Sequence, residues 1–361
     1  MEEKNLGAYV QLNGDIMLGD MPFRFDVGVR YVETDQSSSG FNSGVLVTID
    51  RDPYNDTLPS ANAALSLTDT FIWRVSAAKV MTRPGLGSLS PGGSVDSFNY
   101  RVSFQNPFLE PTRANAFDTS FEWYFADEAL LSLALFYKDI ESRPISSENQ
   151  GTFASTGLPP NLLVPTSPAA NNPEGGPAES CNPANGGTGC WTIRSLENGP
   201  GGTLEGFELG LQMPLAAVSD NLPPFLENFG FIANYAYVDS EVDYTFGSEV
   251  ITERLFGLSN NSYNATVYYE DERFGARLSA AYRDDYITAT SGTGNRFEGF
   301  EGTFNLDFHA NYALTDNFEL SFEALNITDD YQDRWTDLET RRRYEWDHTG
   351  RVFLVGVKYR L

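Results

Sequence analysis

The stretch LTDNFELSFEALNITDD (Leu314–Asp330) decides the fold class, because apolar side chains recur there at every second position. From Phe318 to Ala324, the apolar residues Phe, Leu, Phe and Ala alternate with Glu, Ser and Glu. A period of two is typical of a β-strand that has one apolar face. A soluble sheet packs that face against a core, whereas a membrane barrel turns it toward lipid. The rest of the sequence decides between these two environments.

The same period of two runs through most of the sequence and predicts an all-β protein of about thirteen strands. Strands of about 9–14 residues are long enough to cross a bilayer at a tilt. Their second face carries full charges in mid-strand, such as Arg24 and Asp26. A watery lumen tolerates such groups and a dry sandwich core does not. The predicted strands are residues 6–17, 22–34, 58–67, 70–83, 113–125, 129–140, 203–214, 228–242, 261–270, 274–286, 302–314, 318–328 and 350–361.

The connections between these strands alternate between short and long. Several short ones are Asp-centred turns, such as LTDT (67–70) and EDERF (270–274). Tight turns at one rim and long loops at the other predict a transmembrane antiparallel β-barrel of the outer membrane, with its turns in the periplasm. The apolar face then meets lipid. The short connections are 18–21, 68–69, 126–128, 215–227, 271–273 and 315–317, and the long ones are 35–57, 84–112, 141–202, 243–260, 287–301 and 329–349.

Composition and charge exclude several classes of function. The 361-residue chain has 24 Lys and Arg against 50 Asp and Glu, a formal net charge of −26. It therefore lacks the basic footprint that nucleic acid needs. No run of about 18 apolar residues predicts a spanning helix. The segment MEEKNLGAYVQLN (1–13) is not a secretory signal, since it has no basic region followed by an apolar one. Outer-membrane lipid is the partner that the strand pattern predicts.

Two cysteines, Cys181 and Cys190, lie in a Gly-, Pro- and Asn-rich part of loop 141–202. We expect a local disulfide between them, which implies an oxidising compartment. A reduced, unpaired pair is the alternative. Metal binding is disfavoured, because no His lies nearby and the two cysteines lack a two-residue spacing.

The strand count predicts where this segment lies within a barrel. The last predicted strand runs from the long-loop rim to the short-turn rim, so we expect a periplasmic C-terminus. Counting back thirteen strands, the first strand also runs from the long-loop rim to the short-turn rim. The count is therefore odd, whereas a complete single-chain bacterial barrel has an even strand number. We therefore expect residues 1–361 to be one domain, the C-terminal part of a larger barrel. A miscount by one strand, hidden in loop 35–57 or 329–349, is the alternative.

Four motif-like segments occur along the chain. They are RVSAAKVMTRPGLGSLSPG (74–92), QNPFLEPTRANAFDTSFEWYF (105–125), EALNITDDYQ (323–332) and GRVFLVGVKYRL (350–361). Together, and in this order, they resemble the barrel of TonB-dependent outer-membrane transporters, nearest to the subgroup of sugar-scavenging bacteria of the Caulobacter and Xanthomonas kind. Thr82-Arg83-Pro84 stands where that family has Ser-Arg-Pro, and Leu361 stands where its last residue is usually Phe.

This resemblance implies a barrel of 22 strands around a plug. The thirteen strands here would be the tenth to the last, with the plug and the TonB-contacting segment absent. It implies active uptake of a scarce solute by a full-length, monomeric barrel, driven by TonB acting on the missing plug. An oligosaccharide is the first candidate solute and a ferric siderophore the second. A passive porin or a structural barrel is the alternative function, and a soluble β-sandwich or adhesin is a third.

Candidate sites are confined to the outer loops. No Gly-x-Ser-x-Gly elbow and no His or Cys cluster occurs, so we expect neither catalysis nor a metal or other cofactor. Aromatic faces beside carboxylates and amides would suit sugar rings, and packing at the rim is the alternative for each of them. The candidate ligand-binding residues are Trp191, Tyr331, Trp335, Tyr344 and Trp346.

Charged residues admit two further interpretations. The acids of the last long loop suit Ca²⁺, but the three arginines Arg341 to Arg343 more readily balance them. Charges on the polar strand face either pair across neighbouring strands, which we favour, or contact a plug or solute. The loop acids are Asp329, Asp330, Asp333, Asp337 and Glu339.

Overall fold

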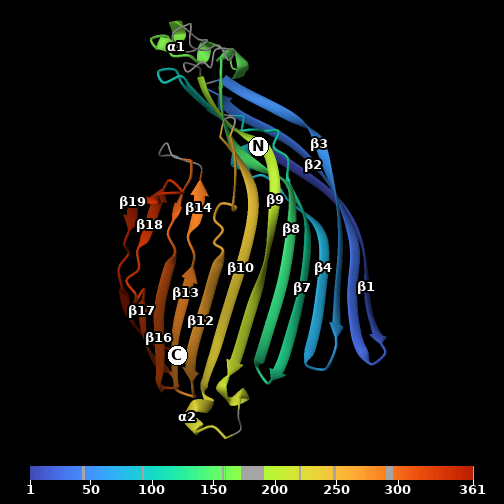
Figure 1. The fold of residues 1–361 in the computed structure, drawn as a ribbon, viewed down its shortest axis with the longest axis vertical. Coiled ribbons are helices and arrows are strands. Elements are labelled where there is room, and N and C mark those ends of the chain that lie inside the picture. The colour runs from blue at the N-terminus through green and yellow to red at the C-terminus, as the bar shows by residue number, and fades with distance from the viewer. Residues whose placement is uncertain are drawn as a thin grey trace.

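One curved antiparallel sheet dominates the computed structural model (Figure 1), which describes residues 1–42, 45–91, 93–156, 158, 160–171, 191–218, 221–246, 249–289 and 296–360. Its thirteen main strands each overlap a predicted strand and pair in chain order, so the all-β prediction is confirmed. In order they are β1 (Glu2–Leu18), β2 (Met21–Asn42), β3 (Val45–Ser66), β4 (Phe71–Thr82), β7 (Thr112–Ala126), β8 (Ala129–Gly151), β9 (Trp191–Pro214), β10 (Phe229–Phe246), β12 (Asn261–Glu270), β13 (Phe274–Arg283), β16 (Thr303–Thr315), β17 (Phe318–Leu325) and β20 (Val352–Tyr359).

Shorter elements occupy the connections. A second sheet has the order β14 (Tyr286–Ala289), β15 (Glu298–Phe300), β18 (Gln332–Thr336) and β19 (Arg342–Asp347). Strand β5 (Gly93–Asp96) pairs with β6 (Arg101–Phe104), β6 runs parallel to β9, and β11 (Glu249–Glu253) pairs with β10. The helices are η1 (Leu86–Leu89), η2 (Ala154–Thr156), η3 (Pro160–Leu162), α1 (Pro168–Asn171), η5 (Leu215–Ala217) and α2 (Pro224–Glu227).

Helices long and apolar enough to span a membrane are absent from the part of the chain that the structure describes.

The two rims of the sheet differ as the sequence predicts. Figure 1 shows mostly tight connections at the rim that carries α2, apart from the one between β9 and β10, and mostly longer connections at the rim that carries α1. In the turn between β12 and β13, the Asp271 carboxylate accepts hydrogen bonds from the backbone N–H groups of Arg273 and Phe274. These bonds hold the pKa of Asp271 below its usual value. Gly19 closes the first turn with φ of +66°, a conformation that favours glycine.

Strand register separates an apolar face from a polar one. The apolar face has little protein cover: Leu135, Leu209 and Leu278 are 43%, 40% and 41% exposed. Apolar side chains left exposed in this number suit contact with lipid. One row across this face, in register from β8 to β13, is Leu133, Leu209, Tyr235, Tyr263 and Tyr282.

Aromatic rings gather on the apolar face near the short-turn rim. Trp73 stacks on Phe121 with ring centres 6.3 Å apart, and Phe229 meets Tyr269 edge-on at 5.0 Å. Such rings are enriched where a barrel crosses the membrane–water interface. We call this set of rings the aromatic girdle. Its members are Phe71, Trp73, Phe121, Trp123, Phe125, Phe229, Tyr269 and Phe274.

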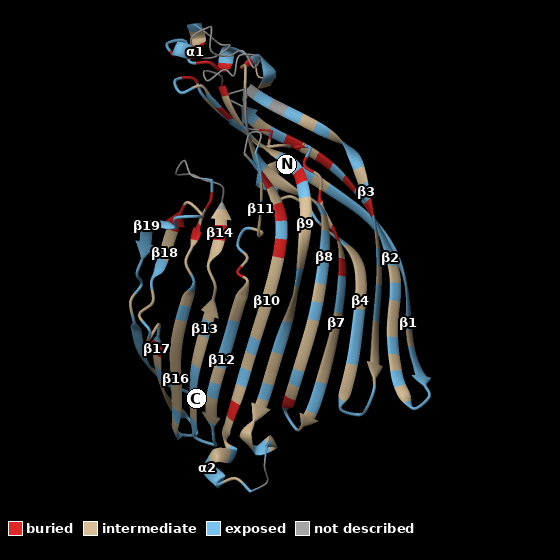
Figure 2. Ribbon diagram, in the orientation of Figure 1, coloured by how far each residue is buried: buried red, intermediate tan, exposed pale blue. Residues whose placement is uncertain are grey.

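Buried residues gather at the opposite, long-loop rim (Figure 2). One apolar cluster packs Val102, Phe153 and Trp191 together with part of loop 141–202. A second cluster packs Tyr244 and Trp335 with residues of β10 and β14. The core of the described protein therefore lies at the outer rim, where the connections pack against the outer ends of strands such as β9 and β10, as expected for a wall between lipid and a lumen.

The prediction of a loop at 35–57 is wrong. β2 continues to Asn42 and β3 begins at Val45. The residues of this extension that face loop 84–112 are polar and buried: Gln36 Nε2 donates to the Pro107 carbonyl at 3.1 Å, and Ser38 Oγ donates to the Leu89 carbonyl at 2.6 Å. The β2 half of the extension, Asp35 to Ser39, is polar on both faces, so the period of two carries no hydrophobic signal there, and the apolar run VLVTI (45–49) of the β3 half is too short to mark a strand by itself.

The two end strands of the path each have one neighbour. Within the described ranges, β1 pairs only with β2, and β20 pairs only with β17. The sheet therefore has two open edges, whose backbone groups lack ladder partners.

Candidate functional site: the inner wall and the outer rim

The polar face of the sheet, here called the inner wall, carries a row of side chains in register across five strands. Asn62 Nδ2 donates to Asp26 Oδ1 at 2.9 Å, and Ser76 Oγ donates to Asp118 Oδ2 at 3.1 Å. The row lines a groove of about 810 Å³ near the short-turn ends of β2 and β4. From β1 to β7 its members are Asn13, Asp26, Asn62, Ser76 and Asp118.

Charge pairing accounts for only part of this wall. Arg74 Nε donates to Glu122 Oε1 at 2.8 Å, as the pairing interpretation predicts. Asp26 and Asp118, by contrast, accept hydrogen bonds from neutral side chains, and Arg24 forms no ion pair with any described residue. The groove thus presents donors and acceptors that a polar solute or a protein segment can use.

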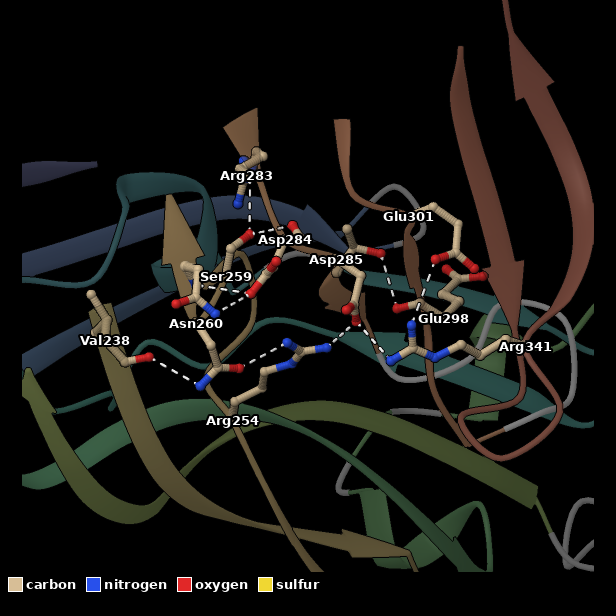
Figure 3. Close-up of polar contacts among 12 residues, drawn as sticks. Val238, Arg254, Ser259, Asn260, Arg283, Asp284, Asp285, Glu298, Glu301 and Arg341 are labelled. Atoms are coloured by element: carbon tan, nitrogen blue, oxygen red, sulfur yellow. Dashed lines mark hydrogen bonds and ion pairs between the residues drawn. The ribbon is translucent and has the colours of Figure 1, made fainter. Parts of the chain in front are cut away.

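At the outer rim, ion pairs join four separate connections (Figure 3). Asp285, between β13 and β14, pairs with Arg254 and also with Arg341, whose Nη2 lies 2.9 Å from Asp285 Oδ2. Arg341 Nη1 lies 3.5 Å from Glu301 Oε2. Arg254 Nη1 donates to Asn260 Oδ1 at 3.0 Å. These contacts hold the outer connections between β10 and β19 together.

A second arginine site lies between β8 and β10. The Arg143 guanidinium lies over the ring of Tyr244 at 4.7 Å, and its Nη2 donates to the Asp243 carbonyl at 3.3 Å. The Arg143 side chain reaches β10 across a glycine-rich stretch of β9. The strands approach closely there, since a Cβ on Gly201 would lie 1.6 Å from the Ile140 carbonyl oxygen. Burial lowers the pKa of Arg143 and raises the pKa of Tyr244 to about 12.

Two of the five predicted ligand-binding residues are inside the outer clusters. Trp191 and Trp335 are both 0% exposed. The Trp191 ring packs against Phe153, with centres 4.9 Å apart, and against Tyr100 at 5.4 Å. In this conformation these two indoles stabilise the loops, and neither offers a face to a solute.

The other three predicted residues are exposed. Tyr331 meets Trp346 edge-on with centres 5.9 Å apart, and stacks on His348 at 4.1 Å. Tyr344 lies apart from this pair and donates from its hydroxyl to Glu298 Oε2 at 3.0 Å. Tyr331 and Trp346 are therefore the pair of the predicted set that the structure brings into ring contact, and both stay exposed although His348 covers one face of Tyr331.

The acidic run of the last long loop is balanced by arginines, as preferred from the sequence. Arg342 pairs with Asp337 at 3.1 Å, and Arg343 pairs with Asp333. No group of metal-ligating side chains forms among the residues that the structure describes. Cys181 and Cys190 lie outside the described residues.

Sequence reasoning missed the arginine networks of the outer rim. Arg254, Asp285 and Arg143 lie in or beside segments that alternate poorly, and the Arg254–Asp285 and Arg143–Asp243 contacts join residues 31 and 100 positions apart in the chain. No local pattern reports such pairing. The only signal was the unusual Gly-Pro-Gly-Gly stretch at 199–202, which marks a close approach of neighbouring strands.

The comparisons with known proteins agree with this geometry. A family model described as the β-barrel of TonB-dependent receptor-like proteins matches residues 1–327. No curated protein sequence matches the chain.

Solved structures share the fold at low sequence identity. The siderophore receptor PiuA from Acinetobacter baumannii has a TM-score of 0.61 and 15% identity, over 99% of this chain and 43% of that one. The ferric-catecholate import receptor Fiu from E. coli K12 has a TM-score of 0.59 and 16% identity, over 99% and 45%. A variant of the ferric enterobactin receptor PfeA from Pseudomonas aeruginosa has a TM-score of 0.57 and 14% identity, over 99% and 54%. The chain spans about half the length of these structures.

Proposed function

Because the chain belongs to the TonB-dependent receptor family through its β-barrel, we propose that it forms part of the wall of an energy-coupled transporter in the outer membrane. The full-length protein takes up a scarce solute, which binds at the outer rim and passes along the inner wall. TonB drives this passage through a plug that residues 1–361 do not provide. The protein is a receptor and transporter, and its chemistry is binding and passage.

One observation carries this proposal: the sheet has an apolar outer face and a polar inner wall with a groove of about 810 Å³. A wall of this kind suits a lumen through which a hydrophilic solute moves. The 22-stranded barrels of this class need about nine strands beyond the thirteen here, and the two open edges are where those strands would pair. In that closed, monomeric barrel the C-terminus would lie in the periplasm, because β20 ends at the short-turn rim.

An oligosaccharide is the first candidate solute. The exposed rings of Tyr331 and Trp346 can stack on sugar faces. Eight arginines of the outer connections are already paired with carboxylates, so they offer little charge to an anionic chelate. The paired arginines are Arg51, Arg113, Arg254, Arg296, Arg334, Arg341, Arg342 and Arg343.

A ferric siderophore is the second candidate, because the similar structures are receptors for siderophores, ferric catecholates and ferric enterobactin. These likenesses support the fold and only suggest the ligand. Arg143, which has no carboxylate partner among the described residues, is a candidate cation for such a chelate at the rim.

A binding screen on the full-length protein separates the candidates. Neutral oligosaccharides and ferric chelates are titrated by calorimetry against the wild type, Trp346→Ala and Arg143→Gln. Sugar binding that falls in Trp346→Ala and persists in Arg143→Gln supports the first candidate, and the reverse supports the second. Uptake that persists without TonB, with open-channel conductance, would instead indicate a passive porin.

A further inference from the structure

The lipid-facing surface of the sheet has a groove directly behind the polar one. It has a volume of about 410 Å³, lies across β2, β3 and β4, and is here called the furrow. We propose that this groove binds an acyl chain of a phospholipid in the membrane leaflet next to the short turns. Its lining consists of the apolar residues Phe23, Phe25, Val27, Ala61, Ala63, Val75 and Ala77, together with Asn62 and Ser76.

Strand register explains the hollow. Phe25 lies opposite Ala63, and Ala63 lies opposite Val75, so a methyl group sits between two larger side chains. One step further along, Ala61 lies between Val27 and Ala77, so the floor there is formed by two methyl groups beside one larger side chain. Phe23 and Phe25 stack with ring centres 5.6 Å apart, which stiffens one wall. The result is a furrow that follows β3 and has no charged side chain in its lining.

The two polar residues beside the furrow are turned away from it. Asn62 donates to Asp26, and Ser76 donates to Asp118, and both acceptors belong to the inner wall. The furrow is therefore apolar along its length, and water gains no hydrogen bonds by filling it.

The position of the furrow indicates its occupant. Its lower end lies beside Leu65 and Trp73, which face each other across β3 and β4. Trp73 stacks on Phe121 and donates from Nε1 to Thr119 Oγ1 at 2.9 Å, as part of the aromatic girdle. From Phe23 to Val27, the lining residues on β2, a strand advances about 13 Å, close to half of the roughly 30 Å hydrocarbon thickness. The furrow thus starts at the headgroup level and runs through one leaflet, as an acyl chain does.

The occupant is a lipid because the furrow is continuous with the lipid-facing surface on both sides. Leu12 on β1 and Phe117 on β7 belong to the same face and are 64% and 53% exposed. A side chain from a second copy of the protein is the competing occupant, and the experiment below distinguishes the two.

Native mass spectrometry of the membrane-extracted full-length protein tests the proposal, with palmitoyl-oleoyl phosphatidylethanolamine as the probe. Ala63→Phe fills the furrow and should weaken the tightest lipid adduct roughly tenfold, since contact with about two methylene groups is lost. Ala280→Phe, a lipid-facing alanine on β13 outside the furrow, is the matched control and should bind like the wild type. Ala61→Phe provides a second filling variant, and the heat-dependent gel shift of folded barrels reports that each variant is inserted.

Equal lipid binding by both filling variants and the wild type would overturn the proposal. So would a loss of dimers in Ala63→Phe with lipid adducts unchanged, because that result assigns the furrow to a second copy of the protein.

Discussion

Glu110 joins two arginines that come from different strands. Its carboxylate pairs with Arg51 of β3 and with Arg113 of β7, and Arg113 also pairs with Asp56. The Asp56 side chain is 4% exposed. An ion pair of this kind is costly to break, because removing one partner leaves the other charge without its hydrogen bonds in a dry site. The segment that resembles a family motif at 105–125 therefore has a structural role in holding the loop to the strands.

The variant Asp56→Asn tests that role. It keeps the shape and removes the charge opposite Arg113, so the outer ends of β3 and β7 should lose about 1–3 kcal/mol of local stability. Hydrogen exchange of the two strand ends measures the change. Asp15→Asn, on the exposed inner wall, is the control. If the backbone amides of the strand ends exchange at the same rate in both variants, the Asp56–Arg113 ion pair contributes nothing to local stability.

Tyr244 gives the outer rim a dependence on alkaline pH. Burial raises its pKa to about 12, above the ordinary value near 10. The folded protein therefore keeps the phenol proton in a range where the unfolded chain releases it. The stability from this group is fully present below pH about 10 and is lost as the pH rises toward 12.

Near-ultraviolet circular dichroism during an alkaline titration should follow this loss, because Trp335 packs in the same cluster. In Tyr244→Phe the component between pH 10 and 12 should disappear, although the variant also loses the 3.0 Å hydrogen bond to the Arg254 carbonyl. An unchanged titration would assign the transition to other groups.

At the scale of elements, the outer cluster around Trp191 gives loop 141–202 a core of its own. The indole is 0% exposed and contacts Phe153 and Tyr100. Trp191→Ala should destabilise this cluster by about 3–5 kcal/mol without unfolding the sheet. Limited proteolysis should then cut the loop region first. Trp346→Ala, at a side chain that is 59% exposed, should leave the cleavage pattern as it is. Faster cutting in both variants would contradict the assignment of Trp191 to a core.

Elements that cross the membrane were predictable, because lipid on one face and water on the other impose the period of two. The extensions beyond the membrane were not, since water or polar loops meet both of their faces, as at Thr34 to Ser38. The short strands β5, β6, β11, β14, β15, β18 and β19 were missed because each has only three to six residues, too few to show a period, although Val102, Ile287 and Trp335 among them pack in the apolar clusters.

The aromatic site candidates were predictable by residue type and not by exposure. Trp191 and Trp346 look alike in sequence, yet packing between distant loops buries the first and leaves the second open. Only the tertiary contacts of Phe153 and Tyr100 separate the two cases.

At the scale of the whole molecule, the two open edges determine how residues 1–361 behave alone. Each unpaired backbone group on β1 or β20 would cost several kcal/mol in hydrocarbon. The chain of 361 residues, expressed alone and refolded into detergent, should therefore aggregate or stay unfolded. Size-exclusion chromatography and the heat-dependent gel shift measure this. A monodisperse monomer with a folded barrel's gel shift would contradict the expectation and point to an edge that closes on itself.

The central claim is that the apolar face of the sheet meets lipid while the inner wall meets water. Nitroxide scanning of β13 in the bilayer-embedded full-length protein tests it most directly, with single labels placed from Gly275 to Tyr282 after Cys181 and Cys190 are replaced. Collisions with oxygen should peak at Ala276, Leu278 and Ala280, and collisions with a water-soluble nickel chelate should peak at the positions between them. Equal access of both reagents at neighbouring positions, or exclusion of both from Leu278, would contradict a lipid-facing wall.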